Sequence, residues 1–172
     1  MSGEAKDASE SATRSVLFAT EEQLVSAAGE TARRWAEARI APLVVALRGD
    51  LGSGKTTWVR AMLRGLGHRG RVPSPTYTLV EHYALPEVGV TVVHLDLYRL
   101  ADDAELENLG FRDWLAEPAT WLLVEWPERS AVLDALADVE LGLEVEGPTA
   151  RRLRAAAKTP RGREAVDRLA GG

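Results

Sequence analysis

Residues 49–56 of this chain have the types and spacing that bind phosphate. They read Gly-Asp-Leu-Gly-Ser-Gly-Lys-Thr and match the P-loop pattern G-x-x-x-x-G-K-[ST] at every fixed position. The glycines can adopt positive φ and let backbone N–H groups approach an anion closely. Lys55 would then reach the β- and γ-phosphates, and the Thr56 hydroxyl would bind Mg²⁺. The predicted nucleotide-binding residues are Gly49, Asp50, Leu51, Gly52, Ser53, Gly54, Lys55, Thr56 and Thr57.

Two acidic residues at the ends of predicted strands supply the carboxylates that nucleotide hydrolysis needs to fix Mg²⁺ and position water. Glu125 follows the apolar run 121–124, in the manner of a Walker-B element, and Asp96 follows the run 90–95. The carboxyl ends of strands in an open α/β sheet face the ligand crevice, although either residue could instead be a solvated strand-end carboxylate. We therefore expect Lys55, Asp96 and Glu125 to be catalytic, and Thr56, Glu125 and Asp96 to bind the metal.

A hydroxyl-rich segment and two single residues complete the candidate site. Thr76, Tyr77 and Thr78 follow two prolines and lead into a predicted strand, and they form either a switch-like γ-phosphate sensor or a structured turn. Trp126 either offers a flat surface near the site or belongs to the core. Arg99 either neutralises phosphate charge or forms a structural ion pair, which is the simpler interpretation. No other arginine stands out, so we expect slow intrinsic turnover that a partner stimulates.

The elements that position these residues follow from hydrophobic periodicity. The run 42–47 is typical of a buried parallel strand, and helical spacing continues from the P-loop to Gly67. Further strands are predicted at 16–18, 77–83, 90–97, 121–124 and 139–145, and helix starts at Thr20, Asp102 and Thr159. The sequence therefore predicts an α/β fold, a single P-loop NTPase domain with a central mixed β-sheet flanked by helices, over residues 14–172.

The two ends of the chain differ from the middle. Residues 1–13 are polar and lack an apolar run, which predicts a disordered tail. Residues 151–172 carry seven basic side chains against two acidic ones, and form either a solvated terminal helix or a patch for an acidic protein or RNA. The net charge of −5 argues against non-specific nucleic-acid binding as the main activity. Without cysteine or a membrane-length apolar run, the composition suggests a cytoplasmic protein.

Four blocks of this sequence resemble the TsaE (YjeE) family, the small bacterial ATPases of tRNA threonylcarbamoyladenosine (t6A) synthesis. They are residues 49–57, 74–81, 94–100 and 124–126, in the family's order. The resemblance implies ATP and Mg²⁺ as ligands. It assigns the phosphates to Lys55, the metal to Thr56 and Glu125, metal or water positioning to Asp96, and the base to the surroundings of Thr20 and residues 147–151, with Trp126 nearby.

The resemblance also implies partners, because the ATPases of this family work with the TsaB and TsaD proteins. TsaD transfers the threonylcarbamoyl group to adenosine 37 of tRNA, while the ATPase keeps the assembly cycling and any tRNA contact is indirect. Two rival functions stay open: a P-loop kinase for a small metabolite, and a nucleotide-gated binding module whose hydrolysis only resets docking. A GTPase is disfavoured because the chain lacks an Asn-Lys-x-Asp or Thr-Lys-x-Asp segment.

Overall fold

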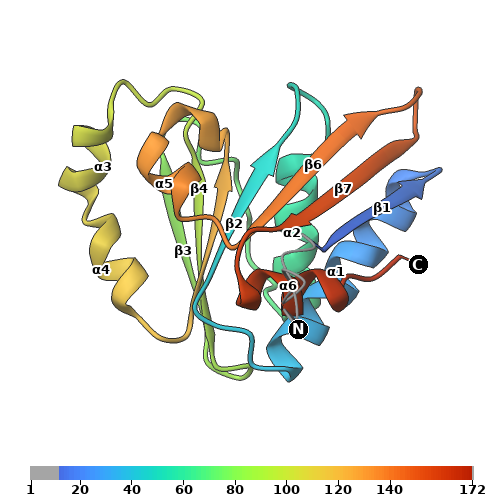
Figure 1. The fold of residues 1–172 in the computed structure, drawn as a ribbon, viewed down its shortest axis with the longest axis horizontal. Coiled ribbons are helices and arrows are strands. Elements are labelled where there is room, and N and C mark those ends of the chain that lie inside the picture. Colours follow the sequence, from blue (N-terminus) through green and yellow to red (C-terminus); the bar gives the residue numbers. More distant parts are fainter. Residues whose placement is uncertain (1–11, 172) are drawn as a thin grey trace, which may run out of the picture.

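A mixed seven-stranded sheet runs through the computed structural model, which describes residues 12–171 (Figure 1). Its central strands are rich in branched apolar residues and are buried on both faces, as parallel strands require. In sheet order the strands are β1 (Thr13–Phe18), β7 (Arg151–Ala157), β6 (Val139–Val145), β2 (Leu43–Arg48), β5 (Thr120–Glu125), β4 (Val90–Asp96) and β3 (Val80–Leu85). Strands β6, β2, β5 and β4 pair in parallel, and the remaining pairs are antiparallel.

Helices cover both faces of this sheet. One face packs on α1 (Glu21–Glu37), α2 (Lys55–Gly65) and α6 (Pro160–Asp167), and the other on α3 (Asp103–Leu109), α4 (Phe111–Ala116) and α5 (Ala131–Ala135) (Figure 1). Strand β2 shows why two cores form: Val44 points into one, and its neighbours Leu43 and Val45 point into the other. The predicted α/β fold with a mixed, helix-flanked sheet is therefore confirmed.

The local signals were accurate for most helix starts. Thr20, Asp102 and Thr159 each cap a helix, and each side-chain oxygen accepts a backbone N–H three residues on. Helices α1 and α2 cross closely because each has a glycine at the contact, Gly29 in α1 and Gly65 in α2. A Cβ added at Gly65 would lie 2.4 Å from the carbonyl oxygen of Gly29. This crossing holds the helix that follows the P-loop against the sheet.

Two predicted elements were wrong. The strand expected from Tyr77 starts only at Val80, because Leu79 has φ 64 and its N–H turns back to the carbonyl of Pro75. The basic stretch does not start as a solvated helix: Arg151–Ala157 is strand β7, between β1 and β6.

The ends of the chain add two observations. The predicted tail lies outside the described residues except for Ala12 and Thr13, and Thr13 already belongs to β1. Among the helices of residues 12–171, none is both long and apolar enough to cross a membrane.

Candidate nucleotide-binding site

The P-loop joins the end of β2 to the start of α2, and its backbone requires glycine. Gly49, Gly52 and Gly54 all have positive φ, at 140, 77 and 110°. At Gly49 a Cβ would also lie 2.4 Å from the carbonyl oxygen of Leu143 on β6, so a larger residue there must displace backbone. The loop that the sequence predicted is therefore wrapped against the sheet at the carboxyl end of its parallel strands, and it opens into the N-terminus of α2.

Lys55 is the buried cation of the site. Its Nζ donates to the carbonyls of Gly49 and Asp50, at 2.5 and 2.9 Å, and lies 4.2 Å from the ring centroid of Trp126. Burial lowers the pKa of the ammonium group, while the charges of Glu125 and Asp96 oppose that shift. Because both carbonyls are neutral acceptors, an arriving phosphate can replace them as partners of the ammonium.

Glu125 is held at the start of α2 by two side chains. The Thr56 hydroxyl lies 2.9 and 3.0 Å from the two carboxylate oxygens of Glu125, and His94 Nε2 lies 2.8 Å from Oε1. Glu125 is 2% exposed and His94 is completely buried. His94 was not among the site residues predicted from the sequence; its place two residues before Asp96, on the same face of β4, was the signal that could have identified it.

Asp96 lies beside Glu125, because the register of the parallel pair β4–β5 places the two residues opposite one another. One carboxylate oxygen accepts from the hydroxyls of Thr76 and Ser74, at 2.8 and 3.2 Å. The other accepts the backbone N–H of Tyr98 at 3.0 Å. The aspartate therefore connects the predicted switch segment to the strand ends.

The oxygen donors at this point fit Mg²⁺. They are one hydroxyl and two buried carboxylates, all hard ligands, at the end of a helix that faces an anion site. Mg²⁺ in proteins is typically bound by one or two carboxylates together with substrate phosphates. Thr56, Glu125 and Asp96 are the residues that would hold it.

The structure does not bring every predicted site residue to this place. Trp126 and Thr76 line the cleft. Tyr77 is 83% exposed and stacks against Arg99, whose guanidinium carbon lies 4.4 Å from the ring centroid. The Thr78 hydroxyl donates a hydrogen bond to the Glu81 carboxylate. Thr20 caps α1 and is not among the lining residues.

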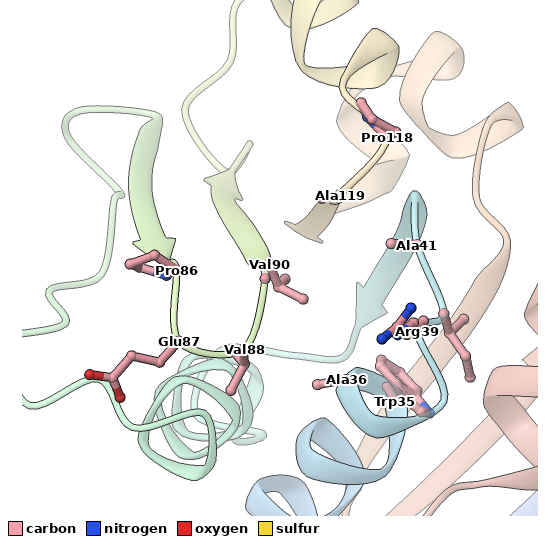
Figure 2. Close-up of a pocket in the computed structure, with 12 residues that line it drawn as sticks. Trp35, Ala36, Arg39, Ala41, Pro86, Glu87, Val88, Val90, Pro118 and Ala119 are labelled. Carbon is pink, nitrogen blue, oxygen red and sulfur yellow. The ribbon is translucent and has the colours of Figure 1, made fainter.

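Cavity size alone would not have identified this cleft. The P-loop cleft has a volume of 260 Å³, whereas a hollow at the opposite end of the sheet has 520 Å³. Figure 2 shows that second hollow between the end of α1, near Trp35 and Arg39, and the β3–β4 turn at Glu87 and Val88. Its lining has one basic and one acidic side chain, whereas the lining of the P-loop cleft has a lysine, four threonine and serine hydroxyls, and two carboxylates. The chemistry therefore points to the smaller cleft.

The site consists of a strand, a glycine-rich phosphate loop and a helix, with carboxylates at the ends of the adjacent parallel strands β5 and β4. This arrangement defines an α/β protein of the P-loop class. The family model of threonylcarbamoyl adenosine biosynthesis protein TsaE matches residues 18–153, and the chain belongs to this family.

Relatives in this family carry the same name. The chain is 43% identical to the tRNA threonylcarbamoyladenosine biosynthesis protein TsaE of Haemophilus influenzae, over 72% of this chain and 76% of the relative. Its identity to the protein of that name from Streptomyces coelicolor is 36%, over 73% and 84% of the two chains. The crystal structure of YdiB from Bacillus subtilis has the same fold, with a TM-score of 0.69 and 22% identity over 91% of this chain and 93% of YdiB. The expected family membership is thus confirmed.

Proposed function

We propose that this chain is an Mg²⁺-dependent ATPase required for threonylcarbamoylation of tRNA adenosine 37, and that it acts with TsaB and TsaD without catalysing the transfer. The observation that carries the proposal is the contact of the Thr56 hydroxyl with the Glu125 carboxylate, at 2.9 and 3.0 Å, beside the P-loop lysine. The names of the relatives support the pathway.

Each residue has a role that follows from its contacts. Lys55 would bind the β- and γ-phosphates in place of the carbonyls that it contacts here. Mg²⁺, when bound, supplies positive charge that stabilises the phosphate oxygens, and Thr56, Glu125 and Asp96 would hold it. Because the Asp96 carboxylate accepts hydrogen bonds from Thr76 and Ser74, binding or loss of the γ-phosphate would be transmitted to the segment 74–79 through this aspartate.

We expect weak intrinsic turnover that the TsaB–TsaD pair stimulates. Arg99, the arginine nearest in sequence to Asp96, stacks on an exposed tyrosine and is not among the lining residues of the cleft. An arginine supplied by a partner is a common way to neutralise charge in phosphoryl transfer.

The test measures phosphate release from ATP with and without purified TsaB and TsaD. Wild type should turn over slowly alone and faster with the pair, and Lys55→Ala should lose both activities. Lys158→Ala is the matched control, because that lysine is exposed and forms an ion pair with Glu140 on β6. Unchanged turnover on adding the pair would count against the proposal.

The same variants separate the two rival functions. If Lys55→Ala restored tRNA modification in cells that lack the native gene, the protein would be a binding module whose hydrolysis is incidental. Transfer of labelled γ-phosphate to a metabolite rather than to water would support the kinase.

A further inference from the structure

Arg151, the first residue of β7, forms hydrogen bonds to the P-loop. Its Nε donates to the carbonyl of Ser53 at 3.1 Å, and its Nη2 to the carbonyl of Gly52 at 3.3 Å. Its Nη1 donates to the carbonyls of Ala150 and Gly147, at 2.9 and 3.3 Å. One guanidinium thus joins two successive P-loop peptides to the β6–β7 turn, about a hundred residues away in sequence.

We propose that Arg151 is a positioning residue of the P-loop: by holding the carbonyl of Ser53 it keeps the N–H of Gly54 aimed at the phosphates, and by holding the carbonyl of Gly52 it fixes the preceding peptide, whose N–H at Ser53 donates to the carbonyl of Asp50. The inference rests on the proposed nucleotide site and deepens it.

The geometry of the peptide bond explains the effect. In a trans peptide unit the C=O and the next N–H point in opposite directions. Since Arg151 holds the carbonyl of Ser53, the N–H of Gly54 points away from the guanidinium, and Gly54 is a lining residue of the cleft. Glycine-rich backbone has many alternative conformations, so a fixed donor reduces the ordering that phosphate binding must otherwise impose. The planar fork of arginine suits two successive carbonyls, which a lysine ammonium cannot match.

The charge of Arg151 distinguishes it from its neighbours on β7. Arg152 pairs with Glu146, directly after β6, at 2.5 Å, and Arg154 pairs with Glu144 on β6, at 2.9 Å. Within residues 12–171, Arg151 takes part in no such ion pair, and its partners are the four neutral carbonyls. Its positive charge is therefore left uncompensated beside an anion site, where it favours phosphate.

The β6–β7 turn holds the arginine in place before any ligand arrives. The N–H of Glu146 donates to the carbonyl of Ala150 at 3.1 Å and closes the turn. The Thr149 hydroxyl donates to the carbonyl of Ala19 at 3.0 Å, which ties the turn to the segment before α1. Arg151 is thus presented to the loop from a supported turn.

The experiment compares Arg151→Ala, Arg151→Lys and the control Arg152→Ala in the full chain. Calorimetric titration with Mg²⁺ present measures affinity for ATP and for inorganic tripolyphosphate, which has no base. We expect Arg151→Ala to weaken both by a similar factor of about ten or more, the value of one charge-assisted hydrogen bond. Arg151→Lys should recover part of the loss, and Arg152→Ala should match wild type.

Hydrogen exchange without ligand provides a readout that does not depend on binding. In Arg151→Ala the amides of residues 52–54 should exchange faster, while amides of the central strands keep their wild-type rates. Wild-type exchange at residues 52–54, or an effect on ATP without one on tripolyphosphate, would overturn the inference. Failure of the wild-type protein to bind ATP would instead contradict the proposed function, so the two failures can be told apart.

Discussion

The buried contact between His94 and Glu125 allows a direct test of the metal site. His94 Nε2 lies 2.8 Å from Glu125 Oε1, and within the described part of the chain Nδ1 has no hydrogen-bond partner. A doubly protonated ring would bury an unpaired N–H at Nδ1, which is costly. The hydrogen bonds therefore fit a neutral ring that carries its proton on Nε2 and donates it to the carboxylate. In this state His94 fixes the carboxylate that we expect to bind Mg²⁺.

The perturbation is His94→Leu, with His94→Gln as its matched control. Leucine fills a similar volume but removes the donor, whereas the glutamine amide can place an N–H near the position of Nε2. A hydrogen bond to a charged group contributes about 1.5–3 kcal/mol, equivalent to about a ten- to hundredfold change in an equilibrium constant. Because Thr56 still contacts Glu125, we expect the lower part of this range.

The assay titrates Mg²⁺ at a fixed concentration of a fluorescent ATP analogue and repeats the nucleotide titration in EDTA. His94→Leu should need about tenfold more Mg²⁺ for half-maximal binding, and His94→Gln should stay close to wild type. In EDTA all three proteins should bind nucleotide alike, since the P-loop contacts are unchanged. The reasoning is refuted if a folded His94→Leu protein, checked by urea unfolding, shows the wild-type requirement for Mg²⁺.

Two further predictions concern stability. Gly65→Ala should lower the free energy of unfolding by about 1–3 kcal/mol, because its Cβ would lie 2.4 Å from the carbonyl oxygen of Gly29 and force α1 from α2. Gly29→Ala, with no contact nearer than 3.4 Å, should cost less, and an equal loss in urea unfolding would exclude the packing explanation. For Glu140, burial favours a raised pKa, but the Arg48 hydrogen bond and the charges of Arg48 and Lys158 outweigh it, and the pKa lies below the ordinary 4.5. A carboxylate with a lowered pKa stabilises the fold at pH values above its pKa in the unfolded chain, and this stabilisation is lost as the pH falls through its pKa in the folded protein. The stability advantage of wild type over Glu140→Gln should therefore vanish on acidification. A stability difference that does not change with pH would disprove this explanation.

The features that could be predicted from the sequence are those that depend on residues close together in the chain. The P-loop, the helix after it and the carboxylate of Glu125 each follow from a run of fewer than about twenty residues, since glycine spacing and an apolar strand are local properties. The start of β3 was missed for a reason that sequence rarely shows. Leu79 adopts φ 64, a conformation that its residue type disfavours and that the tertiary contact of its carbonyl with the N–H of Asp96 supports.

Contacts between distant segments could not be predicted in this way. The partnership of His94 and Glu125 depends on which strand pairs with β4, and the contact of Arg151 with Ser53 depends on where β7 enters the sheet. The local residue pattern does not predict which strands become neighbours in either case. Strand order has to be known before either residue can be assigned a role.

The basic C-terminal stretch shows how strand pairing changes the meaning of a charge pattern. In the sequence, the arginines at 151, 152 and 154 suggest a solvated helix or an acidic partner, because consecutive charges are usually exposed. In the sheet, Arg152 and Arg154 alternate with Leu153 and Ala155, which point into the core, and Arg151 lies on the same face as these two core residues. Arg154 and Arg152 form ion pairs with Glu144 on β6 and with Glu146 directly after it, and Arg151 contacts the P-loop. Much of the positive charge at residues 151–154 is therefore neutralised or bound within the fold. These residues offer less charge to an RNA or an acidic protein than the composition of the stretch suggests, and the functional contribution that we propose for them is at the phosphates, through Arg151.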